Sequence, residues 1–538
     1  MSFFLKAAGG GAAPIVWDNA LNTNVNDQQA WLIVGDSIAR GTAHQFASTS
    51  PDKGPEADYA GSVYYYSGAV TEMPLTDIPG VIYGSMWPSF GNILYKRTSK
   101  KPVFINQGTG GCEFYPNGDN NNWSTSGTLY APAVTAANNC LAALGTTRLR
   151  GIMLCCGIND ARAAQTLANI QAAINSLITR LQTDFPGTPI YIINIGREAT
   201  GTFDARIAAV RGYLEDCTVN FQKVYMAARL ENFLSYYDDI SPDLLHLTQE
   251  GNEEVAHYMG SNLLTNGWIA NNPLVRSYTT EAQNVFARMP GVLSDTEKNL
   301  INDFVNYLER KGWLSQVKVF QFWHMDNQAK SLQDWFRTGK SGTLGSGATW
   351  NANDGITLDG TVNGYVRTNF LPLTDNGGLS NGNTHYIVWL RQAVSLGVDA
   401  CLMGATGPTA THSVVLRQKA DNSLEFSCHT GVLSPSATGP LKANTGHGPC
   451  KTAVSTQKLL TTPFVARTTG TLANTVAYPP NEMYVGAHNN NGVIQQPYQG
   501  KVSCFVFCQA TIAGVFTLPD QLYKKIRAMI LTRKYNIV

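Results

Sequence analysis

Short apolar segments alternate with longer amphipathic segments in the first half of the chain. Continuous apolar runs at residues 31–34, 103–105, 151–155, 190–195 and 224–226 each predict a buried strand. The intervening sequence predicts helices near residues 83–97, 131–144, 163–184, 204–220 and 249–264. Such alternation is typical of a parallel sheet covered by helices on both faces. We therefore predict a three-layer α/β/α domain over residues 30–268, preceded by an N-terminal arm at residues 1–29.

The second half of the chain has a different pattern. Residues 269–315 predict a helical connector, in which Ser294 and Glu297 have the spacing of a capping box. Beyond residue 317, short alternating strands are expected near residues 365–368, 385–390, 413–416, 424–428, 483–486 and 502–507, with a final helix at 520–534. This pattern predicts an antiparallel β-sandwich, or jelly roll, over residues 316–538.

A long connection at residues 42–88 interrupts the predicted α/β domain. It carries three consecutive tyrosines from Tyr64 to Tyr66, as well as Trp87 and many Gly and Pro residues. Because long loops inside compact domains are often functional, we expect this segment to wall a site. Its aromatic side chains would either stack on sugar rings or pack the loop itself, and the sequence favours neither alternative.

Composition narrows the classes of function. A formal net charge of +1 over 538 residues argues against nucleic acid as a partner, because such binding depends on many phosphate contacts. The ten cysteines form neither a disulfide framework nor zinc-ligand spacing, and Cys504 and Cys508 are expected to be free thiols. No segment has the length of a membrane helix, and residues 1–14 lack the apolar run of a signal peptide. We expect a soluble protein that needs no metal or cofactor.

Ser37 is the candidate nucleophile. It follows the predicted strand at residues 31–34 directly, in the turn that would open a helix. A serine hydroxyl there lies at the sheet edge, beside unpaired amides that can bind an oxyanion. The alternative is an ordinary helix cap formed by Asp36 or Ser37.

Two later blocks supply candidate oxyanion donors. Gly108, Gly110 and Gly111 follow the second strand, where a glycine amide can approach a reacting carbonyl. Asn159 follows the strand ending near residue 156, and its side-chain amide is a neutral, fixed donor. Asp160 is expected to hold the loop, by capping a helix that begins near residue 162.

Asp243 and His246 complete the set. Their separation of three residues lets the two side chains meet, so the carboxylate can orient the imidazole while Nε2 faces Ser37. His257, inside the following predicted helix, is expected to be structural, and His44 has no carboxylate at a useful spacing.

With these blocks in order, residues 30–265 resemble the SGNH, or GDSL-type, hydrolases. That resemblance implies an α/β/α esterase fold with Ser37 as nucleophile, Asp243 and His246 as its partners, and Gly111 and Asn159 in the oxyanion hole. Residues 280–538, with the phrase Gly-Ile-Thr-Leu-Asp-Gly at 355–360, are similar to laminin-G or concanavalin-like modules of bacteriophage structural proteins. This second resemblance implies a virion component.

Together these patterns predict a serine esterase of a phage tail or virion surface that removes O-acetyl groups from a bacterial polysaccharide. Its expected partners are that polysaccharide and other virion proteins, and a homo-oligomer would suit a tail protein. It would be made in the host cytoplasm and would not insert into a membrane. One alternative is a non-enzymatic receptor-binding protein with an idle SGNH fold, and another is a lipase or thioesterase.

Overall fold

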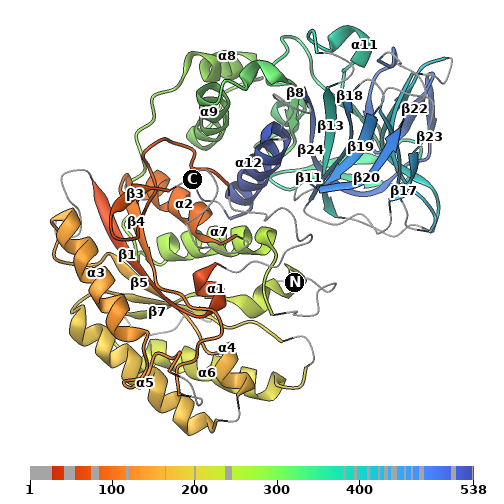
Figure 1. The fold of residues 1–538 in the computed structure, drawn as a ribbon. Helices are drawn as coiled ribbons and strands as arrows, with labels where there is room; N and C mark the ends of the chain where they lie inside the picture. The colour runs from red at the N-terminus through yellow and green to blue at the C-terminus, as the bar shows by residue number, and fades with distance from the viewer. Residues whose placement is uncertain are drawn as a thin grey trace. The chain divides into compact units, whose positions relative to one another are not determined.

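The computed structural model divides into two compact units at Val275 and Arg276, and each is considered by itself. It describes residues 27–41, 55–73, 84–116, 120–163, 165–198, 201–236, 245–379, 383–392, 397–408, 412–421, 424–428, 434–437, 445–453, 456–461, 465–471, 478–509, 517–535 and 537. The first unit is α/β with a parallel core sheet, and the second is built mainly on antiparallel sheets (Figure 1).

A seven-stranded sheet forms the centre of the first unit, in the order β3-β2-β4-β1-β5-β6-β7. All neighbouring pairs are parallel except β2 with β3. The strands are β1 (Gln28–Gly35), β2 (Tyr64–Tyr66), β3 (Val70–Glu72), β4 (Lys101–Asn106), β5 (Gly151–Cys155), β6 (Ile190–Asn194) and β7 (Val224–Arg229).

Helices cover both faces of this sheet because its strands are apolar on both sides. In β1, Leu32 and Val34 belong to one hydrophobic cluster with α3, α5 and α6, whereas Trp31 and Ile33 belong to another with α1, α2 and α7. The helices are α1 (Ser37–Arg40), α2 (Trp87–Thr98), α3 (Tyr130–Leu144), α4 (Ile158–Arg162), α5 (Leu167–Asp184), α6 (Asp204–Asn220) and α7 (Gln249–Thr265), with the 3-10 helix η2 (Leu230–Tyr236).

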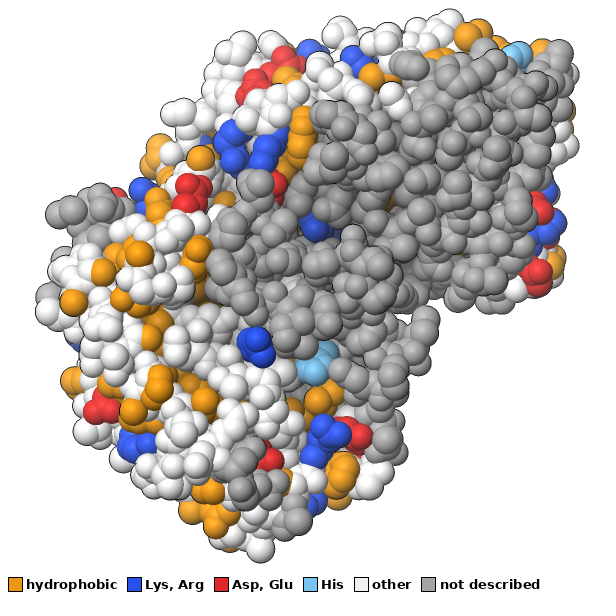
Figure 2. Space-filling model, viewed as in Figure 1, with side chains coloured by type: hydrophobic (Ala, Val, Ile, Leu, Met, Phe, Trp, Pro, Cys, Tyr) orange, Lys and Arg blue, Asp and Glu red, His pale blue; other side chains and the backbone are white. Residues whose placement is uncertain are grey.

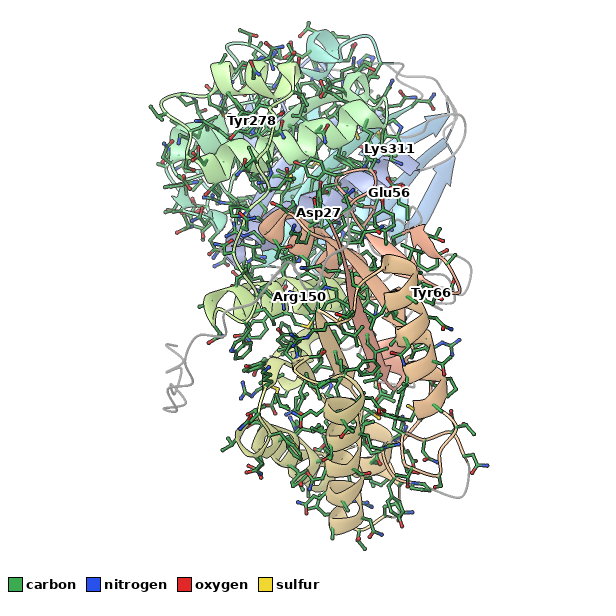
Figure 3. The ribbon with its side chains drawn as sticks, turned by 90° about the vertical axis from the view of Figure 1, so that its left-hand side faces the viewer. Asp27, Glu56, Tyr66, Arg150, Tyr278 and Lys311 are labelled. Carbon is green, nitrogen blue, oxygen red and sulfur yellow. The ribbon has the colours of Figure 1, made fainter. Side chains whose placement is uncertain are left out.

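The aromatic residues of the long connection pack within this unit. Trp87 is fully buried at the start of α2, and its Nε1 donates to the Ala39 carbonyl at 2.9 Å. Tyr64, Tyr65 and Tyr66 form β2 beside β4, and all three side chains pack against the two core clusters. Figure 3 labels Tyr66 of this strand. Trp87 is therefore enclosed in the core, whereas the three tyrosines are half-buried, and for them both alternatives stay predictions. The rest of the connection, at residues 42–54 and 74–83, lies outside the described residues.

Two sheets face each other in the second unit. The first has the order β10-β11-β24-β13-β18-β19-β20 with β8 beside β24, and the second has the order β17-β16-β15-β14-β21-β12-β9 with β22 and β23. Apolar residues of both sheets, among them Val388 and Phe505 from one and Leu402 and Leu416 from the other, form a single cluster between them. The opposite face of the first sheet packs against α8 (Thr280–Arg288), α9 (Asp295–Arg310) and α12 (Thr517–Lys534).

The remaining elements of this unit are short strands and turns of helix. The strands are β8 (Val317–Phe322), β9 (Thr343–Leu344), β10 (Ala348–Asn351), β11 (Gly355–Asp359), β12 (Val366–Arg367), β13 (Thr384–Gln392), β14 (Ala400–Thr406), β15 (Ser413–Gln418), β16 (Leu424–Cys428), β17 (Ser434–Ala437), β18 (Thr445–Ala453), β19 (Thr456–Thr461), β20 (Val465–Thr471), β21 (Tyr484–Val485), β22 (His488–Asn490), β23 (Val493–Gln495) and β24 (Gln499–Gln509). The short helices are η3 (Leu314–Gln316), α10 (Gln328–Leu332) and α11 (Pro372–Asp375). The predicted capping box of α9 is present, with Ser294 and Glu297 in reciprocal hydrogen bonds.

Candidate active site

Ser37 lies in a tight turn at the carboxyl end of β1. Gly35 has φ +144°, and a side chain there would overlap the carbonyl of Cys155 in β5, so only glycine fits. The Asp36 amide donates to that carbonyl at 2.8 Å, and its Oδ1 caps α1 by accepting from the Ile38 amide at 3.0 Å. Ser37 is thus the first residue of α1, where its own amide has no acceptor within the helix.

His246, which lies near the end of the first unit's sequence, contacts Ser37. Its Nε2 is 2.7 Å from Ser37 Oγ, although 209 positions separate the two residues. In the tautomer with its hydrogen on Nδ1, Nε2 accepts the hydroxyl proton. Buried Leu245 and Leu247 hold the segment on either side, and Thr248 caps α7 by accepting from the Gly251 amide at 3.2 Å. This contact has the geometry of an activated nucleophile and its base.

Asp243, the expected partner of His246, lies outside the described residues, as does His44. The orienting role of Asp243 therefore stays a prediction. His257, the histidine of the following helix, is buried in α7, where its Nδ1 is 2.8 Å from the Glu253 carbonyl oxygen. Burial lowers the pKa of His257 to about 4, so it is neutral at pH 7 and has a structural position.

Asn159 lies at the carboxyl end of β5, in α4. Its Nδ2 donates to the Cys112 carbonyl at 3.0 Å, which uses one of the two hydrogens of the amide. Cys112 follows Gly111 directly, so this bond joins the two blocks that were expected to supply oxyanion donors. The second hydrogen of Asn159 Nδ2 remains to bind an anion.

The three candidate glycines differ in what their amides contact. The Gly108 amide donates to Asn106 Oδ1 at 3.0 Å and is therefore occupied. The amides of Gly110 and Gly111 have no acceptor within the described parts of the chain. Gly111 is exposed and has φ +74°, and a Cβ added there would meet nothing within 4 Å.

Asp160 links the two donor segments. Its carboxylate accepts from the Phe114 amide at 2.9 and 3.0 Å and from the Tyr115 amide at 3.0 Å. It therefore holds the loop that follows Gly111. The expectation that Asp160 caps a helix near residue 162 was wrong, because α4 begins at Ile158 without a side-chain cap. Burial raises the pKa of Asp160 to about 7, against the opposing effect of these backbone hydrogen bonds.

Asp36, which the sequence suggested only as a helix cap, also places a carboxyl group in the interior of the first unit. It is fully buried, and burial raises its pKa to about 6, while the Ile38 amide and a charged His246 both lower it. Its Oδ2 has no hydrogen-bond partner among the described residues. A buried carboxylate near the base favours the imidazolium that forms when Ser37 loses its proton.

The thiols under the site do not compete as nucleophiles. Burial raises the pKa of Cys155 and Cys156 well above the usual value, so both stay protonated at neutral pH. Cys112 Sγ donates to the Gly35 carbonyl at 3.1 Å. The nine cysteines whose side chains are described, Cys504 and Cys508 included, are buried and form no disulfide with one another.

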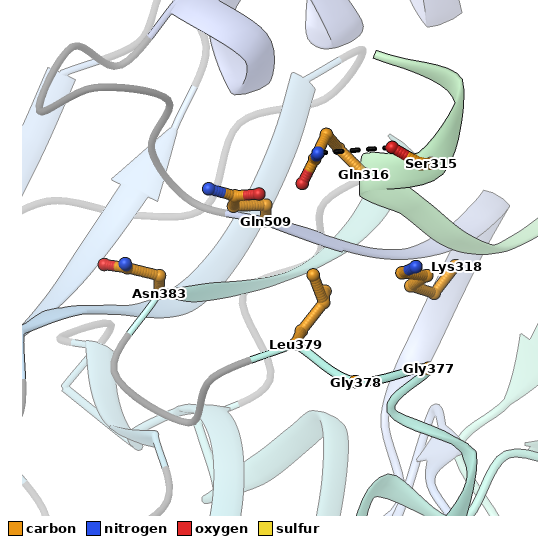
Figure 4. A pocket seen from close by; sticks show the side chains of 8 residues that line it. All are labelled: Ser315, Gln316, Lys318, Gly377, Gly378, Leu379, Asn383 and Gln509. Carbon is orange, nitrogen blue, oxygen red and sulfur yellow. Dashed lines mark hydrogen bonds between the residues drawn. The ribbon is translucent and has the colours of Figure 1, made fainter.

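The second unit contains a polar cavity of about 310 Å³ (Figure 4). Side chains of Ser315, Gln316, Lys318, Asn383 and Gln509 line it, together with Gly377, Gly378 and Leu379. Gln316 Nε2 donates to Ser315 Oγ at 3.3 Å, and no nucleophile and base meet among these residues. Their chemistry suits binding of a polar ligand rather than ester hydrolysis.

The described residues contain no cluster of three His, Cys, Asp or Glu side chains able to hold a metal ion. Among the same residues, no helix is long and apolar enough to cross a membrane. On the face shown in Figure 2, Lys and Arg side chains of the described residues are scattered rather than gathered in one basic area.

No protein-family model matches the chain, and no curated protein matches it. Solved structures with a similar backbone include a protein from Arabidopsis thaliana, at 18% identity and a TM-score of 0.34, which covers 45% of this chain and 98% of that chain. NanS has 11% identity and a TM-score of 0.32 with the same coverage. Est24, a carbohydrate acetylesterase from Sinorhizobium meliloti, has 13% identity and a TM-score of 0.29, covering 44% and 98%. Similarity this low assigns no activity, so any function must follow from the site's own residues.

Proposed function

We propose that the first unit is a serine esterase that removes short acyl groups, above all acetyl, from a saccharide. The observation that carries this proposal is the 2.7 Å contact between Ser37 Oγ and His246 Nε2 at the carboxyl edge of a parallel sheet. The amides of Ser37 and Gly111 and the side-chain amide of Asn159 are the oxyanion donors in this proposal. Neither a metal nor a cofactor is needed for this chemistry.

The reaction has two halves. Ser37 Oγ attacks the acyl carbonyl carbon as His246 Nε2 takes the hydroxyl proton, and the carbonyl oxygen becomes an oxyanion bound by the three donors. His246 then gives its proton to the departing alcohol oxygen, which leaves the acyl group on Ser37. Water, deprotonated by the same imidazole, attacks this acyl-enzyme and releases the carboxylic acid and free Ser37.

A short acyl group suits the small and polar residues around the nucleophile. Gly110, Gly111 and Asn159, which follow β4 and β5, are small or polar, whereas a long acyl chain would require an aliphatic groove. Rates with p-nitrophenyl acetate, butyrate and octanoate test this directly, because a deacetylase should prefer acetate and a lipase or thioesterase should not.

Hydrolysis of p-nitrophenyl acetate and covalent labelling by a serine-directed phosphonate test the nucleophile. Both should disappear in Ser37→Ala and persist in Ser126→Ala, a control on an exposed loop. Acetate release from a panel of O-acetylated bacterial polysaccharides then identifies the natural substrate. Wild-type protein that shows neither turnover nor labelling would mean that the esterase proposal is wrong.

A second proposed role, carbohydrate binding by the second unit, rests on its polar cavity. Carboxamides of Gln316, Asn383 and Gln509 both donate and accept hydrogen bonds, as sugar hydroxyls require. The double variant Gln316→Ala/Lys318→Ala should weaken polysaccharide binding in titration calorimetry, whereas Lys298→Ala, outside the cavity, should not. Unchanged binding in the double variant would rule out this site.

The resemblances supply the rest of the proposal. We assign the first unit to the SGNH architecture and the second to a laminin-G or concanavalin-like jelly roll. We place the protein on a phage tail or virion surface, with a bacterial polysaccharide and other virion proteins as partners. Immunodetection of the chain on purified virions would test this location, and its absence from them would contradict it.

A further inference from the structure

Arg40 occupies a fixed position beside the nucleophile. It ends α1, three residues after Ser37, so the two side chains leave neighbouring positions of one helical turn. Its amide donates to the Asp36 carbonyl at 2.9 Å, and its carbonyl accepts from Asn106 Nδ2 at 3.0 Å. Gly108 packs so closely on the Arg40 backbone that any side chain there would overlap it. The base of the Arg40 side chain is therefore held rigidly.

The guanidinium of Arg40 reaches the loop that carries the candidate oxyanion donors. Its Nη1 is 3.6 Å from the point where a Cβ on Gly110 would stand, and Gly111 is the next residue. Since Gly110 has no side chain, nothing from that residue separates the guanidinium from the space above the loop.

Arg40 is half-buried, and its guanidinium makes no ion pair or hydrogen bond with another described residue. Most other partly buried arginines have a carboxylate partner: Arg276 pairs with Asp303 at 3.0 Å and Arg337 with Asp375 at 2.9 Å. Partial burial removes water from Arg40 without such compensation. A ligand's anionic group would supply the missing partner for the Arg40 guanidinium.

We propose that Arg40 forms an anion subsite that binds a carboxylate of the substrate, so that the esterase acts on an acidic saccharide. This inference rests on the proposed function of Ser37 and His246. The planar guanidinium matches a carboxylate in a two-bond fork, a geometry that a neutral hydroxyl cannot offer. A uronic acid residue that carries both a carboxylate and an O-acetyl group is the class of sugar that would place one on Arg40 and the other at Ser37.

The test compares two substrates that differ only in charge: an O-acetylated methyl glycoside of galacturonic acid and its uronamide. Wild-type protein should release acetate from the acid with a kcat/KM about tenfold to a hundredfold above that for the amide. Arg40→Gln should bring this ratio close to one, mainly through a higher KM for the acid. Arg40→Lys should retain part of the preference, and added salt should reduce it in wild type.

Arg148→Gln is the matched control, because it removes the same charge three residues before β5, at the amino end of that strand, whereas Asn159 follows its carboxyl end. It should leave the ratio unchanged, and melting temperatures of all variants verify folding. Equal rates on acid and amide in wild type would overturn the anion subsite. An equal loss on both substrates in Arg40→Gln would also overturn it, in favour of a role in the reaction itself. If the esterase proposal itself is wrong, wild-type protein will show neither p-nitrophenyl acetate hydrolysis nor phosphonate labelling. This outcome differs from failure of the anion subsite alone, in which both persist.

Discussion

The buried carboxyl of Asp36 makes Asp36→Asn a quantitative test of the electrostatics of the site. Burial raises its pKa from 3.8 to about 6. The native protein therefore holds a proton on Asp36 that the unfolded chain has already released between about pH 4 and pH 6, so wild-type stability falls as pH rises through this window. At about 1.4 kcal/mol per pH unit the whole loss is about 3 kcal/mol, of which about 2 kcal/mol lies between pH 4.5 and pH 8.

Asparagine at position 36 keeps an oxygen for the Ile38 amide, which Asp36 caps at 3.0 Å, but it cannot ionise. Relative to wild type, the free energy of unfolding of Asp36→Asn should therefore rise by about 2 kcal/mol from pH 4.5 to pH 8. Asp160, whose pKa is also raised, titrates in both proteins and cancels in the difference.

Hydrogen exchange of peptides covering β1, together with urea unfolding at four pH values, measures this difference in the first unit. Ser126→Ala, which removes no ionisable group from an exposed turn, is the control and should show no pH-dependent difference. If the difference between Asp36→Asn and wild type stays flat within about 0.5 kcal/mol, Asp36 is not a strained buried acid and the reasoning is refuted.

Three further outcomes are expected. Asn159→Ala should lower kcat about a hundredfold to a thousandfold with little change in melting temperature, and a loss below tenfold would remove it from the oxyanion hole. Gly108→Ala should displace α1 and slow phosphonate labelling, because its Cβ would overlap the Arg40 backbone. A Cβ at Gly111 meets open space, so Gly111→Ala should destabilise the fold by only about 1–2 kcal/mol. Equal labelling rates in the two variants would contradict this contrast. Glu297→Gln should destabilise the second unit by about 3–5 kcal/mol in urea unfolding, because it leaves buried Lys330, now 2.7 Å away, without its carboxylate; an unchanged midpoint would show that the pair adds nothing.

Elements with strong local patterns could be predicted from the sequence. The predicted strand at 151–155 and helix at 204–220 have the bounds of β5 and α6, because an apolar run in the first and a helical period in the second are set by nearby residues. The parallel sheet of the first unit and the antiparallel sheets of the second confirm the fold class at this level.

Elements that depend on distant partners could not be predicted. The strand β2, Tyr64–Tyr66, lies in a Gly- and Pro-rich stretch and pairs with β4, almost forty residues later. In the second unit β18 contains two glycines and a proline, which disfavour a strand locally, yet it pairs with both β13 and β19. Partners far along the chain determine such strands.

The site shows the same division. Order along the chain was enough to predict that Ser37 and Asn159 follow strands at the carboxyl edge of a parallel sheet, with His246 in the last connection. The raised pKa of Asp36 and the unpaired guanidinium of Arg40 were not expected, since burial and the absence of a partner depend on the packing of several segments.

The carboxyl group of Asp160 stiffens the loop that follows Gly111, one of the proposed oxyanion donors. Asp160 accepts hydrogen bonds from the amides of residues 114 and 115, and Asn159 donates one to the Cys112 carbonyl. These hydrogen bonds connect the loops after β4 and β5 at two points. The two donors would then shift together rather than independently when the sheet flexes. Substitutions at one loop should be felt at the other, and pairs of them should combine less than additively in their effect on turnover.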